Sequence, residues 1–184
     1  VTTTVGYKSG TSLTTGVQNT LIGGLAGDAL TDADYNVAVG NNTLSTDTQG
    51  SKSTAVGYEA LTAQNFTSAT DSHNTAVGHQ AGAAVTTGTE NTLIGSLSGD
   101  ALTTGVRNTA VGKSSLSANT TGDFNTAVGR TALENVTTAD GNTAVGVAAG
   151  SQTTTGANNT AMGYLALNLN TTGADNVAIG AVAL

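Results

Sequence analysis

Residues 125–129 read Asn-Thr-Ala-Val-Gly, and versions of this pentapeptide return along the whole 184-residue chain. Eleven copies begin at residues 2, 19, 36, 53, 74, 91, 108, 125, 142, 159 and 176. Successive copies therefore start seventeen positions apart, except for the longer step from position 53 to position 74. A fixed period of this kind predicts a solenoid, in which each repeat is one coil that buries its core against its neighbours.

Three positions of the repeat hardly vary. The fourth position is apolar in every copy and β-branched in all but one, where it is Met162. Such constancy argues against the disorder that abundant Gly, Thr, Asn and Ser would otherwise suggest. The first position is mostly asparagine, at Asn19, Asn36, Asn74, Asn91, Asn108, Asn125, Asn142, Asn159 and Asn176. The fifth is always glycine, at Gly6, Gly23, Gly40, Gly57, Gly78, Gly95, Gly112, Gly129, Gly146, Gly163 and Gly180.

Seventeen residues are too few for a helical hairpin, and they suit a coil of two short strands and two turns. The first strand is expected on Thr-Ala-Val, because β-branched residues favour extended backbone. The glycine that follows ends this strand, since glycine tolerates positive φ at a tight turn. A second strand is expected near positions eight and nine, a small residue followed by Leu or Gly. The Thr-Thr-Gly segment then returns the chain.

The predicted fold is all-β, a parallel β-solenoid or β-roll of eleven 17-residue coils. It forms one domain over residues 1–184 and, at the usual strand spacing, is about 50 Å tall. The four extra residues before Asn74 are expected to loop out near residues 68–73.

The ninth and twelfth positions vary together. Where the ninth is glycine the twelfth is usually large and apolar, as with Gly27 and Leu30. Where the ninth is leucine the twelfth is usually polar, as with Leu116 and Asn119. Because protein interiors are closely packed, one bulky group per coil is expected to fill the same space from either backbone position.

The strand also predicts an interface. Alternate side chains point to opposite faces, so positions two and four share one face and position three takes the other. We expect one face to line the coil. The other, the alanine column with Leu21 and Leu93 as larger members, is expected to be exposed in a lone chain. An exposed apolar stripe usually marks an interface, which predicts a parallel homo-oligomer.

Composition excludes several functional classes. The net charge is −7, with five basic residues far apart in sequence, so no basic stripe exists for nucleic acid. No cysteine is present to form disulfides or a thiolate metal site. No apolar run reaches the roughly 18 to 20 residues of a membrane span, so membrane insertion by this segment is not expected. No signal peptide is found, the chain begins at Val1, and both ends fall inside the repeat. We therefore expect it to be part of a longer array.

The sixth position, just after the turn glycine, is the most variable and is expected to be exposed. The simplest explanation of this variability is that position six lies in a solvated turn, since turns tolerate substitution. Stacked along one edge, its large residues could instead contact a host-surface glycan or protein. These candidate contact residues are Tyr7, Tyr58, His79, Lys113, Arg130 and Tyr164.

Catalytic and metal-binding signals are weak. The asparagine column is expected to be structural, because stacked amides satisfy one another and the turn backbone. Asp71, His73 and His79 lie near the insertion without a known ligand spacing, so no metal and no cofactor are expected. A nucleophile needs a base and an orienting group, and the chain has only two histidines, so no enzyme is predicted. Asp28 and Asp100 follow the repeat and are expected to be surface turn residues.

The copy at residues 176–181, Asn-Val-Ala-Ile-Gly-Ala, resembles the head repeat of trimeric autotransporter adhesins of the YadA-like class. The commoner form, as at residues 125–133, is similar to repeats in tail-fibre-type proteins of phages and bacteria. The resemblance implies a left-handed β-roll, wound as a homotrimer, in an extracellular location on a cell surface or virion. Here the step is seventeen residues rather than the shorter adhesin-head step. The sequence contains no coiled-coil stalk, membrane anchor or chaperone domain.

These features predict a structural and adhesive segment of a surface fibre, which presents or forms a receptor-binding surface. Its expected partners are copies of itself and a host-surface glycan or protein. One alternative is a subunit of a self-assembling extracellular filament, stacked head to tail, because no polar caps are seen at the ends. Another is an ice-binding β-solenoid, given the abundant threonine. Against it, the adjacent Thr-Thr pairs point to opposite faces.

Overall fold

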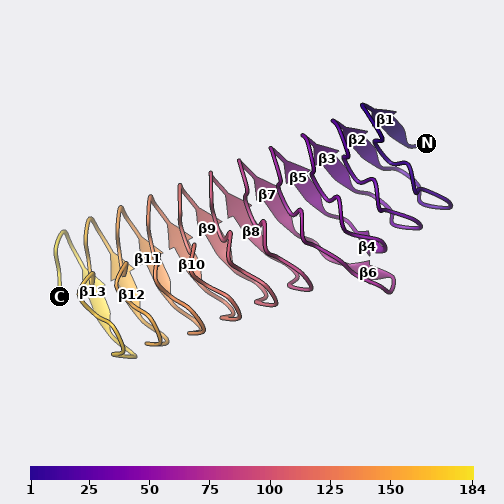
Figure 1. The fold of residues 1–184 in the computed structure, drawn as a ribbon. Coiled ribbons are helices and arrows are strands. Elements are labelled where there is room, and N and C mark those ends of the chain that lie inside the picture. The colour runs from indigo at the N-terminus through magenta and orange to yellow at the C-terminus, as the bar shows by residue number, and fades with distance from the viewer.

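The computed structural model describes residues 1–184 and shows one long stack of coils (Figure 1). Strands of successive coils lie side by side in a single parallel sheet, which confirms the predicted all-β parallel solenoid. The eleven strands of this sheet are β1 (Thr3–Val5), β2 (Thr20–Ile22), β3 (Val37–Val39), β5 (Thr54–Val56), β7 (Thr75–Val77), β8 (Thr92–Ile94), β9 (Thr109–Val111), β10 (Thr126–Val128), β11 (Thr143–Val145), β12 (Thr160–Met162) and β13 (Val177–Ile179). A two-stranded sheet pairs β4 (Gly50–Ser51) with β6 (Thr70–Asp71).

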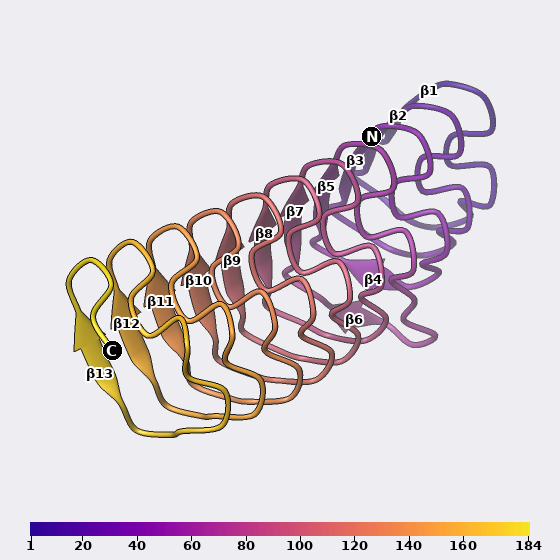
Figure 2. The same cartoon turned by 60° about the vertical axis from the view of Figure 1, so that its left-hand side comes forward.

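The coils stack so that equivalent positions of the repeat are neighbours. Thr126, Ala127 and Val128 of β10 lie beside the equivalent threonine, alanine and valine of β11. Of 110 backbone–backbone hydrogen bonds only 21 lie within strands, so most of the backbone bonding runs through turns and connections. Viewed obliquely along the stack, the coils repeat nearly the same outline from one terminus to the other (Figure 2).

The predicted second strand near positions eight and nine is absent, and this prediction was wrong. Positions seven and nine have left-handed backbone, as at Ser114 (φ 53°) and Leu116 (φ 55°). Left-handed residues two apart cannot form an extended strand. The segment still bonds to the next coil, since the Leu116 N–H donates to the Ala132 carbonyl at 3.0 Å. Each regular coil therefore contains one strand and a chain of turns.

The insertion widens one coil rather than looping out over residues 68–73. Only residues 67–69 form an exposed tip, because Thr70 and Asp71 pair as β6 with β4. Ser72 is fully buried and Phe66 is 7% exposed, so both ends of the tip are fixed to the core. His73 has φ 51°, the left-handed value found at the last position of the other coils.

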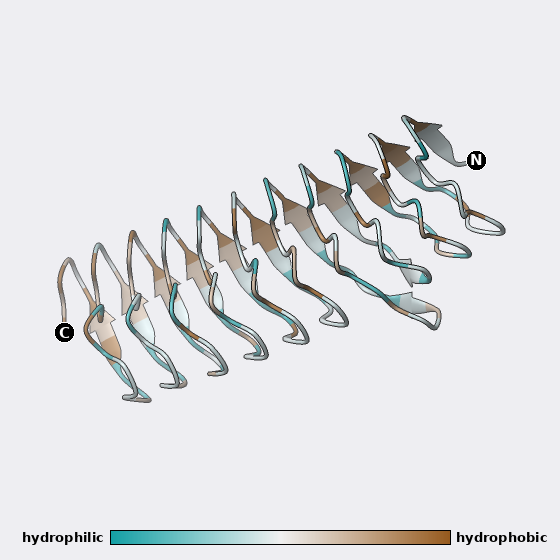
Figure 3. Ribbon diagram, in the orientation of Figure 1, coloured by the Kyte–Doolittle hydropathy of each residue, from teal (hydrophilic) through white to brown (hydrophobic).

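The interior of each coil is lined by position three of the strand. Ala38 and Ala127 are fully buried, and so are Leu21 and Leu93. The prediction that this column would be exposed and form the interface was therefore wrong. The coil is narrow, and position three packs against buried residues such as Ala132 and Leu133 from the opposite wall in one continuous cluster. Positions two and four face outward instead, and apolar colour recurs along the row of strands in Figure 3.

The compensation between positions nine and twelve is confirmed. Leu116 and Leu102 are both fully buried, although they come from different positions of the repeat. A Cβ atom added at Gly82 would lie 3.0 Å from Leu61 Cδ2 and 3.3 Å from Val85 Cγ2. The two positions therefore fill neighbouring space, and most coils hold a large apolar side chain at only one of them. The coil that begins at residue 125 is an exception, since Leu133 and Val136 are both buried.

Thr153 departs from this rule and gives a prediction. It occupies the twelfth position, is fully buried, and its hydroxyl has no hydrogen-bond partner. The Thr153→Val change is expected to raise the free energy of unfolding by about 1 kcal/mol, because it removes an unsatisfied buried hydroxyl. Equilibrium urea denaturation measures this difference. Thr154→Val is the control: the Thr154 hydroxyl donates to the Thr171 carbonyl at 3.0 Å, so this variant should gain no stability. Equal gains in both variants would refute the explanation.

Candidate functional surfaces

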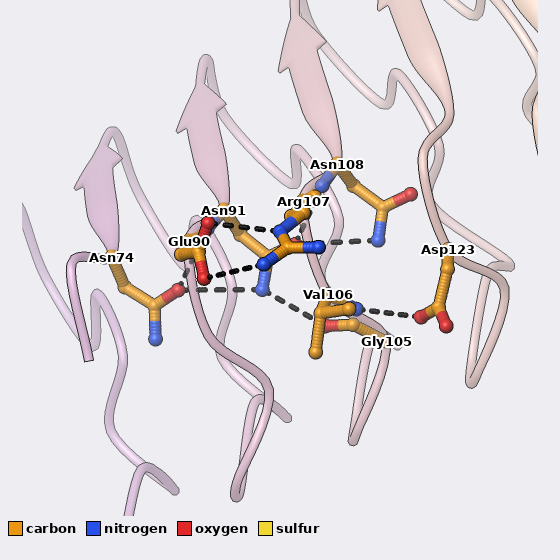
Figure 4. A network of polar contacts seen from close by, with 8 residues as sticks. All are labelled: Asn74, Glu90, Asn91, Gly105, Val106, Arg107, Asn108 and Asp123. Carbon is orange, nitrogen blue, oxygen red and sulfur yellow. Dashed lines mark hydrogen bonds and ion pairs between the residues drawn. The ribbon is translucent and has the colours of Figure 1, made fainter. Parts of the chain in front are cut away.

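The asparagine column forms a hydrogen-bonded ladder inside the stack (Figure 4). Asn108 Oδ1 accepts from the backbone N–H of Asn125 at 3.0 Å and from its Nδ2 at 3.3 Å. Asn108 Nδ2 donates to the Gly122 carbonyl at 2.9 Å and to Asn91 Oδ1 at 3.2 Å. The amides of the central coils are buried and bonded on both sides, so they present no free group to a ligand. Buried members are Asn19, Asn36, Asn74, Asn91, Asn108, Asn125, Asn142 and Asn159; Asn176 in the last coil is exposed.

The ladder changes chemistry beside the insertion, where Ser53 replaces asparagine. The fully buried Asp47 carboxylate accepts from two backbone N–H groups, each at 3.0 Å, and from Gln64 Nε2 at 2.6 Å. Gln64 Nε2 also donates to Ser53 Oγ at 2.8 Å, and Gln64 Oε1 accepts from Asn74 Nδ2 at 2.8 Å. This cluster joins the widened coil to the regular ladder. It was missed in the sequence, because polar residues at the twelfth position were considered only as accompanying a leucine at the ninth.

All six candidate contact residues at position six are exposed, as expected, and lie in one column: Tyr7, Tyr58, His79, Lys113, Arg130 and Tyr164. The column is not a continuous aromatic edge. Gly24 and Asn41 stand between Tyr7 and Tyr58. Tyr58 and Tyr164 are six coils apart, about 29 Å at the usual strand spacing. The three tyrosines therefore cannot contact one small ligand together.

Two neighbours in this column do meet. The Tyr58 and His79 rings stack with centroids 5.4 Å apart and 19° between their planes. Beside them, at position seven, Gln80 Nε2 donates to Glu59 Oε2 at 2.7 Å. The hydrogen bond from Gln80, together with one from Tyr58, lowers the pKa of the Glu59 carboxyl. Conversely, the hydrogen bond to Glu59 raises the pKa of the Tyr58 hydroxyl.

A second interacting edge lies at the last position of the repeat. Arg107 Nε donates to Glu90 Oε2 at 2.9 Å, and its guanidinium lies 5.6 Å from the centre of the Phe124 ring. Hydrogen bonding to Arg107 lowers the pKa of the Glu90 carboxyl. Asp123 Oδ1 accepts from the backbone N–H of Val106 at 2.7 Å (Figure 4). This edge was missed in the sequence, although the regular spacing of Glu90, Arg107 and Phe124 at one repeat each could have indicated it.

The structure does not bring Asp71, His73 and His79 together as metal ligands. Asp71 forms an ion pair with Lys52, and His79 stacks on Tyr58. No group of three His, Cys, Asp or Glu side chains has the geometry of a metal site. The surface also has no detectable pocket. None of the elements is a helix that could cross a membrane.

Asp28 and Asp100 lie in turns, as predicted, but their side chains are half-buried and not freely exposed. Each has one carboxylate oxygen that is buried without a partner. Burial raises the pKa of the Asp100 carboxyl above its ordinary value. Both residues lie in the coils that carry Leu21 or Leu93. Neither side chain forms a hydrogen bond to another residue.

The most regular surface is the outward face of the eleven-stranded sheet, called here the Thr–Val face. It consists of positions two and four of every coil. Position two is threonine or valine and position four is apolar, so the face contains no charged residue. Val77 is 36% exposed, Ile94 39% and Met162 42%. Hydroxyl and branched methyl groups therefore repeat along the full height of the stack.

No protein-family model, no curated protein and no solved structure matches this chain. Its class is defined by its own geometry, which is that of a parallel β-solenoid repeat protein with one short strand per coil.

Proposed function

We propose that this chain is a non-enzymatic structural and adhesive segment of an extracellular fibre, on a bacterial cell surface or a virion. It associates with two parallel copies of itself, in a left-handed trimer as the resemblance to adhesin heads implies. The resulting rod holds a receptor-binding surface away from its anchor. Two features support a stiff rod. Backbone hydrogen bonds join each coil to its neighbours, and the asparagine ladder is buried along the stack.

The Thr–Val face is the observation that carries this proposal. The chain has five basic and twelve acidic residues, yet none occupies this face on any of its eleven strands. The core of a protein interface is typically depleted of charged residues. A sheet face in contact with water, by contrast, usually carries polar and charged side chains. A second copy has the same coil spacing, so its face can match this one along the whole stack.

Light scattering of the folded protein, with negative-stain images of the same sample, tests the proposal. A discrete particle of about three times the chain mass of 17.9 kDa, seen as a short rod, is the expected result. A stable monomer would contradict the trimer. Open-ended polymers would favour the filament subunit instead.

Charge placed on the Thr–Val face should dissociate the trimer. Ile94→Lys combined with Val77→Lys is expected to give a folded monomer, because two desolvated, unpaired ammonium groups per chain oppose association. Both positions are exposed in the single chain, so its own packing is retained. Thr104→Lys is the matched control, on an exposed turn of the same coil as Ile94. Light scattering and circular dichroism measure mass and fold. Equal dissociation by the control would show that another face forms the contact.

The same face gives the ice-binding alternative a specific basis. The adjacent Thr-Thr pairs that disfavour ice binding, such as Thr120 and Thr121, lie outside the strands and are not part of this face. On this face position two is threonine in nine of eleven coils, and position four is valine or isoleucine in ten. These outward groups form a nearly regular array, about 4.8 Å by 6.7 Å. Ice binding needs this face free, whereas trimer assembly covers it. A monomer that shows thermal hysteresis, lost in Ile94→Lys, would establish ice binding.

A further inference from the structure

One surface cluster interrupts the otherwise repetitive exterior. It occupies positions six and seven of the third, fourth and fifth coils, and is called here the Tyr58 cluster. Elsewhere no ring stacking and no side-chain to side-chain hydrogen bond joins these positions of neighbouring coils, as with Gly24 and Leu25 or Ser96 and Leu97. The members of the cluster are Asn41, Asn42, Tyr58, Glu59, His79 and Gln80.

The aromatic half of the cluster is exposed. Tyr58 is 45% exposed although its ring stacks on His79, and this is the one aromatic pair in the protein. Each ring keeps one face free of the other ring. Aromatic rings with a polar tip combine an apolar surface with a hydrogen-bonding group, which is why they are enriched where proteins bind partners.

The polar half is held by a hydrogen bond that joins two coils. Glu59 Oε2 accepts from Gln80 Nε2 in the following coil at 2.7 Å. This hydrogen bond is the largest cause of the lowered pKa of the Glu59 carboxyl. The carboxylate is therefore ionised at neutral pH, and its hydrogen bond fixes the orientation of the Gln80 amide. Holding side chains in place before binding reduces the entropy lost when a ligand arrives.

We propose that the Tyr58 cluster binds a short neutral oligosaccharide. A sugar presents an apolar C–H face, which packs on aromatic rings, and neighbouring hydroxyls, which bond to planar carboxylate and amide groups. The cluster offers both kinds of group within three coils, about 10 Å along the stack. The Glu59 carboxylate and the net charge of −7 disfavour acidic sugars. This inference rests on the proposed function, because it names where the fibre segment meets its receptor.

A purely structural role leaves the cluster unexplained. The Glu59–Gln80 bond is the single side-chain to side-chain hydrogen bond between positions six and seven of neighbouring coils. The remaining coils stack equally well without such a bond. Exposed polar pairs contribute little stability, so stabilising the stack does not require this arrangement.

A glycan array tests the inference. Neutral hexose and N-acetylhexosamine oligosaccharides are printed beside their sialylated counterparts, and the folded protein and its variants are applied. The unmodified protein is expected to bind neutral glycans. Tyr58→Ala and Glu59→Gln should each lose binding at least ten-fold, while Tyr164→Ala should not change it. Tyr164 is the matched control, since it is 57% exposed in the same column and lies outside the cluster.

Three results would overturn the inference: no binding to neutral glycans, preference for sialylated glycans, or equal loss in Tyr164→Ala. Thermal unfolding of each variant confirms that binding is measured on folded protein. The outcome is separable from that of the proposed function. A trimeric rod that binds no neutral glycan refutes only the Tyr58 cluster, whereas a monomer that binds through Tyr58 refutes only the trimer.

Discussion

Replacing Gly112 by alanine is expected to destabilise the stack by about 3–5 kcal/mol, through backbone strain and a steric clash together. Gly112 has φ +137°, a backbone conformation that residues with a side chain rarely adopt. A Cβ atom there would lie 2.5 Å from the carbonyl oxygen of Gly129 in the next coil, which is backbone and cannot rotate away. Equilibrium urea denaturation followed by circular dichroism measures the loss.

Gly180 separates the two causes. Its φ of +125° is similar, but the nearest atom to an added Cβ is Ala183 Cβ at 4.0 Å. Gly180→Ala should therefore cost only the backbone term, of order 1–3 kcal/mol. If Gly112→Ala cost no more than Gly180→Ala, close approach between coils would not explain the invariant glycine column. Because coils contact only their neighbours, the Gly112 variant should also split unfolding into two transitions on either side of the defect.

The period made the architecture predictable from sequence. Once copies recur at a fixed step, parallel in-register pairing follows, and the structure places Thr126 beside Thr143 as the period requires. The glycine at position five, at a positive-φ turn, was also predictable from glycine chemistry alone. The compensation between positions nine and twelve followed from the co-variation of Gly27 with Leu30 and of Leu116 with Asn119.

The conformational preferences of single residues mispredicted the backbone where contacts between stacked coils override them. Leu116 (φ 55°), Phe124 (φ 59°) and Thr131 (φ 55°) adopt left-handed backbone that costs such residues about 1–2 kcal/mol each. No single-residue preference predicts this, so the turns at positions seven to nine were mistaken for a strand. Bonds to neighbouring coils offset the strain, as when the Phe124 N–H donates to the Val106 carbonyl at 3.1 Å.

The sequence pattern also could not show which face of the strand is buried. Alternation shows that positions two and four oppose position three, but it does not say which set lies inside. In the structure the alanines, with Leu21 and Leu93, line the interior, so the exposed apolar stripe lies on the opposite face. The Tyr58 cluster was hidden for a different reason. The sequence placed Tyr58 and His79 in one column of consecutive coils, but it could not show that their rings stack or that Gln80 beside them bonds to Glu59.

Asn108→Ala is expected to lower the free energy of unfolding by about 1–3 kcal/mol, because it leaves the buried backbone N–H of Asn125 without a partner. The Asn108 side chain bonds to the Asn125 N–H, which begins the following repeat, and to the Gly122 carbonyl of its own repeat. The Gly122 carbonyl also accepts from Asn119 Nδ2 at 3.0 Å. Neither group gains access to water when the side chain is truncated, since the column is fully buried at this coil. Urea denaturation gives the magnitude, and hydrogen exchange at the Asn125 amide reports the local opening.

Asn168→Ala is the matched control, because Asn168 is half-buried in a turn outside the ladder. It should cost less than about 0.5 kcal/mol, the usual range for surface changes away from such features. Asn108→Asp sharpens the test further. It keeps an acceptor for the Asn125 N–H but loses the donor to Gly122 and adds a buried charge. Asn108→Asp should therefore be most destabilising when the new carboxylate is ionised, and lowering the pH should restore part of its stability. A ladder variant whose stability equals that of Asn168→Ala would show that turn geometry, rather than the stacked amides, holds the coils together.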